Sequence, residues 1–140
     1  VNPTPWETPR EDSDKGIAKR IKKLVKQLDD PGKSIFNLHA PPHGTMLDLA
    51  PELDANKKPV TVAGQVNFVH VGSKAVAEAI ERHQPMIGLH GHIHESPRIT
   101  GSWKDRLGST HMFSAAHDGE ELALVRLDLD SPEEAERILL

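Results

Sequence analysis

Two short apolar runs that each lead into a histidine are the clearest feature of the hydrophobic pattern. The first run covers residues 34–39 and is stopped by Pro41 and Pro42, and the second covers residues 86–90 and passes straight into a stretch rich in glycine and histidine. Apolar runs of this length, bounded by proline or glycine, are typical of buried strands. We therefore predict strands over 34–39 and 86–90, each carrying histidine at its C-terminal end.

Two other stretches have the spacing of amphipathic helices. The first, over 14–28, follows Ser13 or Asp14 as N-cap, and its apolar stripe consists of Ile17, Ile21, Leu24, Val25 and Leu28. The second follows Ser73 as N-cap and directs Val76, Ala79 and Ile80 inward. Because this second helix lies between the two predicted strands, the order strand, helix, strand predicts a parallel crossover.

The last third of the chain changes to the alternating pattern of strands. We predict strands over 99–103, 110–115 and 121–129, with a hairpin turn at Asp118-Gly119 and a short acidic helix that begins at Ser131. Residues 1–12 and 40–71 have no clear period. We expect an extended loop over 1–12 and a long loop near the site over 40–71, within an α/β fold.

The chemistry is concentrated where the second apolar run ends. His90, His92 and His94 alternate there, and on an extended backbone alternate side chains point to the same face. Neutral imidazole is the commonest side-chain metal ligand. Gly91 lets the backbone approach a bound group closely or adopt a positive φ. Since His39 leaves the other predicted strand, we expect His39, His92 and His94 to converge.

These residues also carry a family resemblance. The block NLHAPPHGT at 37–45 and the block HVGSKAVAEAIERHQPMIGLHGHIHES at 70–96 resemble the C-terminal half of calcineurin-like metallophosphoesterases. The resemblance implies a four-layer αββα fold of mixed sheets flanked by helices, of which residues 1–140 form an incomplete, C-terminal portion of one domain. It also implies two divalent ions (Mn, Fe or Zn), with His39 and His92 on one ion and His94 on the other.

Three motifs of that family are absent from the chain: D-x-H, G-D-x-x-D and G-N-H-[ED]. They supply the bridging aspartate and the histidine usually assigned as general acid, so both are expected in a missing N-terminal half. The resemblance therefore implies a segment of an enzyme that hydrolyses a phosphorylated small molecule or ester, a phosphomonoester or a phosphodiester, by metal-activated hydroxide. The chain alone is expected to be inactive.

Other polar residues lie near the predicted metal ligands in the sequence. Asn37, His90 and Glu95 are expected to line the pocket or to orient a ligand, although the alternation leaves His90 open as a direct ligand. Five polar residues of the predicted long loop are expected at the surface: His43, Asp48, Glu52, Asp54 and His70. His111 and His117 are expected to be ordinary surface or packing residues.

Two other functions remain open. One is a non-catalytic metal-binding or interaction module, and the other is a mononuclear zinc hydrolase built on the same three histidines with Glu95 as base. The 140 residues contain 36% hydrophobic residues, low against the typical ~45–50%, which fits an incomplete domain. The net charge of −4 gives no reason to expect nucleic acid, and no run is long enough for a membrane helix. We expect a cytoplasmic protein.

Overall fold

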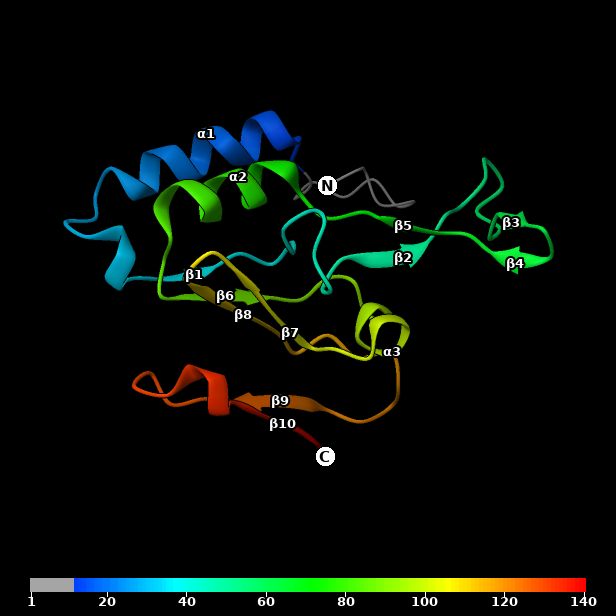
Figure 1. The fold of residues 1–140 in the computed structure, drawn as a ribbon. Helices are drawn as coiled ribbons and strands as arrows, with labels where there is room; N and C mark the ends of the chain where they lie inside the picture. Colours follow the sequence, from blue (N-terminus) through cyan, green and yellow to red (C-terminus); the bar gives the residue numbers. More distant parts are fainter. Residues whose placement is uncertain (1–11) are drawn as a thin grey trace.

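A computed structural model describes residues 12–140 as a mixed α/β fold with three layers (Figure 1). Helices α1 (Asp14–Val25) and α2 (Lys74–His83) form the upper layer, a four-stranded sheet forms the middle, and a two-stranded ribbon lies on the other face of the sheet. The mixed α/β class is therefore confirmed. The extended loop expected over 1–12 lies, except for its last residue, outside the described residues.

The four-stranded sheet has the order β1-β6-β8-β7. Its strands are β1 (Ile35–Asn37), β6 (Ile87–His90), β8 (Thr110–Ser114) and β7 (Lys104–Leu107). Strands β1 and β6 are parallel, with Ile35 opposite Ile87, and β8 is parallel to β6 and antiparallel to β7. This confirms the prediction of two neighbouring parallel strands, because β1 and β6 are the apolar runs that lead into histidine.

Both long helices begin at the predicted serine caps. The side chain of Ser13 accepts a hydrogen bond from the Gly16 amide, and Ser73 does the same for Val76. Six buried residues join the helices to one face of the sheet, together with the loop residue Leu47: Ile21, Phe36, Val76, Ala79, Ile80 and Met112. The stripe predicted for α2 is confirmed. On α1, however, the helix ends at Val25, and Leu24 and Leu28 are 60% and 40% exposed.

The opposite face of the sheet is covered by the ribbon of β9 (Ala123–Arg126) and β10 (Glu136–Leu139). The hairpin predicted at Asp118-Gly119 is wrong, because β8 already has β6 and β7 on its two edges and offers no free edge to β9. The terminal helix is also wrong beyond one short 3-10 turn, η2 (Pro132–Glu134). The residues after that turn become β10, the partner that β9 needs.

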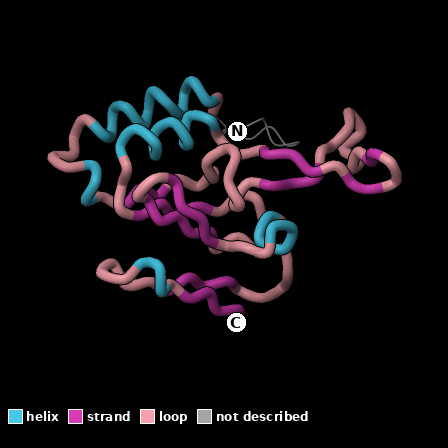
Figure 2. Tube along the Cα trace, viewed as in Figure 1, coloured by secondary structure: helices cyan, strands magenta, loops and turns pink. Residues whose placement is uncertain are grey.

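Residues 49–70 form a hairpin arm instead of the predicted irregular loop. Strand β2 (Leu49–Pro51) pairs with β5 (Phe68–His70) at its base, and β3 (Thr61–Val62) pairs with β4 (Gln65–Val66) at its tip. Figure 2 shows the arm extending away from the layered body. The ladders are only two or three residues long, which is too short for a clear period of two in the sequence.

The strand predicted over 99–103 is wrong. Residues 96–100 form the short helix α3 (Ser96–Thr100), which has proline in its first turn, where the fixed φ of proline suits a helix, and ends at Gly101 with φ 73°. The remaining element is the short 3-10 turn η1 (Pro31–Lys33) before β1. Within the described residues, no helix is both long and apolar enough to cross a bilayer.

Candidate functional site

His39 and His92 lie against each other at the C-terminal ends of β1 and β6. Their ring centroids are 5.2 Å apart and the ring planes meet at 72°. Each histidine follows its strand by two residues, so the parallel pairing of the strands brings the two rings together. Two imidazoles bound to one ion at about 2.1 Å have centroids roughly 5–6 Å apart. The separation of the two rings is thus within the range of two ligands that share one divalent ion.

The backbone between the two strands fixes this arrangement. The Leu38 amide donates to the Leu89 carbonyl at 3.0 Å, and the Gly91 amide donates to the His39 carbonyl at 2.9 Å. A Cβ atom added to Gly91 would lie 3.4 Å from two atoms of the His39 ring. Gly91 thus allows the imidazole of His39 to approach the backbone of the neighbouring segment closely.

The positive φ of this segment falls on His92, not on Gly91. His92 has φ 68°, a left-handed conformation that is costly for a residue with a Cβ atom. Strand β6 ends at His90, and residues 91–95 are irregular, with a bend at His92 and a turn at His94 and Glu95. The expectation of an extended backbone that carries His90, His92 and His94 on one face is therefore wrong, because the strand ends at His90 and the backbone is left-handed at His92.

His90 lies inside the molecule. Its side chain is 8% exposed, and Nδ1 lies 2.9 Å from the Leu38 carbonyl and 3.2 Å from the Ala40 carbonyl. Burial lowers the pKa of His90 below its ordinary value, and the two carbonyl contacts only partly oppose this effect. The ring is therefore neutral, with its proton on Nδ1. Within residues 12–140, its buried Nε2 has no hydrogen-bond partner.

The other predicted site residues are more peripheral. His94 and Asn37 are exposed, and Glu95 is half-buried just before α3. Across the described part of the chain, no group of three or more His, Cys, Asp or Glu side chains is arranged to hold a metal ion. The structure thus brings His39 and His92 together but does not gather His94 with them. It offers no support for a mononuclear zinc site built on these three histidines.

Asp48 is a buried carboxylate at the centre of a hydrogen-bond cluster that the sequence did not reveal. It is 0% exposed, and its carboxylate accepts hydrogen bonds from the amides of Gly44, Thr45 and Gly72 at 3.1, 2.8 and 2.9 Å. Nδ1 of His70 lies 2.8 Å from the same carboxylate. The expectation of a surface position for Asp48 is wrong, because these donors satisfy the buried charge. An acid three residues after Gly44-Thr45 is a usable signal of a carboxylate that closes its own loop.

Two imidazoles flank this carboxylate. Nδ1 of His43 lies 3.8 Å from Asp48, and the rings of His43 and His70 have centroids 5.9 Å apart with planes at 70°. Both side chains are partly exposed, at 36% and 44%. Asp48 therefore holds the base of the hairpin arm, through His70, to the loop that follows His39.

Ser96 connects that loop to the segment carrying His92. Its buried hydroxyl donates to the Met46 carbonyl at 2.9 Å and accepts from the Leu49 amide at 3.1 Å. The Thr100 hydroxyl reaches the same Met46 carbonyl at 3.0 Å. Figure 1 shows α3, the start of β2 and the end of β5 gathered beyond the C-terminal ends of β1 and β6. Hydrogen bonds thus join the loop after His39 to the segment after His92, close to the histidine pair.

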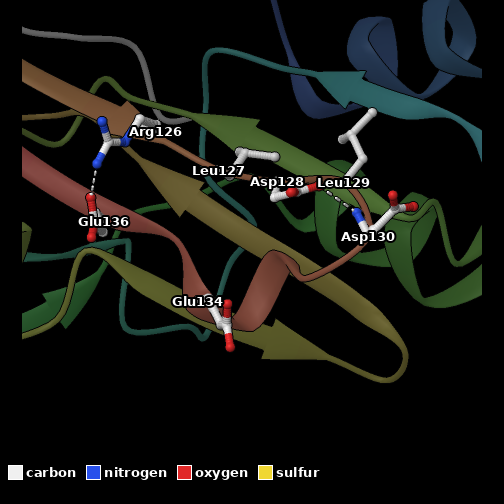
Figure 3. Close-up of a pocket in the computed structure, with 7 residues that line it drawn as sticks. All are labelled: Arg126, Leu127, Asp128, Leu129, Asp130, Glu134 and Glu136. Carbon is white, nitrogen blue, oxygen red and sulfur yellow. Dashed lines mark hydrogen bonds and ion pairs between the residues drawn. The ribbon is translucent and has the colours of Figure 1, made fainter.

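A hollow on the molecule lies elsewhere, at the β9-β10 ribbon (Figure 3). Its lining is mainly acidic, and within it Arg126 forms an ion pair with Glu136: Arg126, Leu127, Asp128, Leu129, Asp130, Glu134 and Glu136. None of the residues predicted for the site lines it. We therefore identify the candidate site by the chemistry of the histidine pair and not by the shape of the surface.

Comparison with known proteins gives one relative of uncharacterized function. Uncharacterized protein MJ1162 of Methanocaldococcus jannaschii is 36% identical to this chain over 112 residues, which cover 78% of the chain and 41% of MJ1162. The chain thus spans less than half the length of this relative. No family model and no solved structure matches the chain.

Proposed function

We propose that these residues form the C-terminal part of a metal-dependent phosphoesterase of the calcineurin-like type, which hydrolyses a phosphomonoester or phosphodiester. The observation that carries the proposal is the pairing of His39 and His92 at the C-terminal ends of two adjacent parallel strands. Open α/β sheets place their sites at this end of their strands. The proposal includes the αββα fold, to which the helix layer, the sheet and the β9-β10 ribbon would contribute.

In this proposal His39 and His92 hold one divalent ion, and the exposed His94 serves a second. Mn²⁺, Fe and Zn²⁺ accept imidazole together with oxygen ligands. Such ions neutralise phosphate charge and supply hydroxide near neutral pH. Imidazoles bring no negative charge, so the bridging carboxylate and the general acid are assigned to residues outside this chain. The greater length of MJ1162 leaves room for them in a protein of this kind.

A non-catalytic metal-binding or interaction module is the second candidate. Among residues 12–140 no group of three or more side chains is arranged to hold a metal ion, so within this part of the chain the module would have only the His39–His92 pair and no carboxylate for catalysis. Such a module would bind a metal through His39 and His92 and would not hydrolyse phosphoesters. The two candidates therefore differ in turnover and not in the identity of the metal-binding residues.

The test uses the protein expressed from its complete reading frame. Turnover of p-nitrophenyl phosphate and bis-p-nitrophenyl phosphate is measured with Mn²⁺, for the wild type, His92→Ala and His111→Ala. We expect turnover to fall at least a hundredfold in His92→Ala and to stay within twofold in His111→Ala, since His111 lies near the start of β8, opposite Ile87 at the start of β6.

Equal turnover in the wild type and His92→Ala would contradict the proposal. No turnover in any form, together with metal binding that needs His92, would favour the non-catalytic module. The 140-residue chain alone is expected to be inactive. Metal-dependent turnover by that chain would show that the site needs no further residues.

A further inference from the structure

His90 contacts the backbone on both sides of His39. Its Nδ1 lies 2.9 Å from the carbonyl of Leu38 and 3.2 Å from the carbonyl of Ala40, the residues immediately before and after His39. Strand β1 ends at Asn37, so these carbonyls lie beyond its last strand residue. His90 therefore holds the peptide plane between Leu38 and His39 and the plane between Ala40 and Pro41, so it restrains the chain on both sides of His39.

The position of the His90 proton follows from these contacts. Two carbonyl oxygens are acceptors only, so the nitrogen between them must carry hydrogen. Nε2 is then an acceptor, and it is buried with no partner among the described residues. A Cβ atom added to Gly88 would lie 2.7 Å from this Nε2, so the ring occupies the space that glycine leaves open.

This environment is a poor one for an imidazole if packing were its only purpose. An unpaired buried acceptor has lost its hydrogen bonds to water, whereas an apolar side chain would lose none. The same added Cβ atom at Gly88 would lie 3.3 Å from Met112, which belongs to the apolar cluster under the helices. What the imidazole provides here, and an apolar residue does not, is the donor that holds the two carbonyls.

The segment after β6 holds the peptide between His39 and Ala40. The Gly91 amide donates to the carbonyl of His39 itself, and the His39 ring packs over Gly91. We propose that His90 is a positioning residue that fixes the His39 imidazole in the direction needed to share a cation with His92. The metal assignment rests on the proposed function, whereas the effect of His90 on His39 does not.

The test compares three substitutions of His90 in the protein expressed from its complete reading frame. The amide nitrogen of asparagine reaches the place of Nδ1, so His90→Asn keeps the donor. Glutamine places its amide near Nε2, so His90→Gln is polar but lacks that donor, and His90→Leu fills the space without any polar atom. The readouts are the Zn²⁺ affinity by titration calorimetry and the NMR resonance of the His39 ring in metal-free protein.

We expect His90→Leu and His90→Gln to lower the Zn²⁺ affinity at least tenfold and to shift the His39 resonance, while His90→Asn stays within threefold of the wild type. Should His90→Leu fail to fold, the comparison of His90→Asn with His90→Gln decides. An unshifted His39 resonance in His90→Gln would overturn the inference. Unchanged Zn²⁺ affinity in His39→Ala and His92→Ala would instead overturn the proposed metal site, and the His39 resonance would still test His90.

Discussion

The molecule contains two imidazole pairs of nearly the same geometry. His39 and His92 have centroids 5.2 Å apart with planes at 72°, and His43 and His70 have centroids 5.9 Å apart with planes at 70°. The second pair is held by a side chain, the buried carboxylate of Asp48. The first pair is positioned through the backbone of two strand ends. Ring proximity alone therefore does not distinguish a candidate metal site from a structural anchor.

The groups behind each pair indicate its role. The carboxylate of Asp48 accepts hydrogen bonds from three amides and also contacts His70. These four partners occupy the roughly four lone-pair sites of a carboxylate. Asp48 is thus engaged in closing the loop and fixing the arm. His39, in contrast, is exposed at a strand end, with its orientation set from behind by His90. This difference indicates an anchoring role for the pair around Asp48, and it leaves the pair at the strand ends as the one to which our proposal gives the cation.

The largest expected effect comes from removing the carboxylate of the anchoring pair. Asp48→Ala leaves one buried and two partly buried amide donors without their acceptor, and we expect the free energy of unfolding to fall by about 3–5 kcal/mol. The matched control is Asp54→Ala, since Asp54 also accepts from two loop amides but lies exposed in the arm. Urea denaturation measures both. Similar losses in the two variants would show that Asp48 does not organise the loop.

The next effect concerns the metal affinity of the two pairs. We expect His39→Ala and His92→Ala each to weaken Zn²⁺ binding about tenfold or more, equivalent to about 1.4 kcal/mol. His43→Ala and His70→Ala are the matched controls, with an expected change of about twofold or less. Titration calorimetry provides the comparison. Greater weakening in the His43 or His70 variant would reverse the assignment of the two pairs.

The pH dependence of stability tests the neutral state of His90. Its pKa in the folded protein lies below the ordinary 6.5, so the unfolded chain binds a proton that the folded chain does not. The contribution of His90 to the free energy of unfolding should therefore be constant above pH 6.5 and fall by up to about 1.4 kcal/mol per pH unit below it.

Thermal melts of metal-free wild type and His90→Leu between pH 7.5 and 5.5 provide the measurement. The difference between the two proteins isolates His90 from the other histidines. We expect the decline to be shallower in His90→Leu. Parallel curves would mean that His90 takes up its proton equally easily in the folded and unfolded chain.

The smallest effect concerns the backbone of the strand-end pair. The left-handed conformation at φ 68° destabilises a residue with a Cβ atom by about 1–2 kcal/mol. A new glycine lowers the free energy of unfolding by about 0.4–1 kcal/mol, because it gives the unfolded chain more conformational entropy. His92→Gly should therefore raise the free energy of unfolding by up to about 1 kcal/mol while weakening Zn²⁺ binding. His39→Gly is the control, because φ at His39 is not positive, and it should give no gain. A loss of stability in His92→Gly would argue against strain at this residue.

Local signals in the sequence were sufficient for the part of the site built on strand ends. The strands at 35–37 and 87–90, the caps Ser13 and Ser73 and the meeting of His39 with His92 all follow from apolar runs, capping residues and proline stops. These features depend on a few neighbouring residues and on one rule, that parallel strands end at the same edge.

The features that failed depend on contacts between distant parts of the chain. Whether 121–129 pairs with β8 or with the C-terminal residues depends on which edges of β8 are occupied, and β6 and β7 occupy both. Asp48 is polar by residue type, and besides the nearby amides of Gly44 and Thr45 its burial depends on the remote Gly72 amide and His70 ring, which supply the remaining partners of its carboxylate. The positive φ of His92 was equally out of reach, since Gly91 beside it is the residue that favours that conformation.

The hairpin arm has a consequence for how the chain folds. Ile35 pairs with Ile87, a separation of 87 − 35 = 52 residues, so the candidate site forms only after a long loop containing the arm has closed. Contacts of such high sequence separation slow folding, yet the entropic cost of closure rises by only about 0.6 kcal/mol for each doubling of loop length. The exposed tip at Thr61–Val66 is therefore a place where insertions or deletions should change the reach of the arm at little thermodynamic cost, while Asp48 and Ser96 keep its base in register with the site.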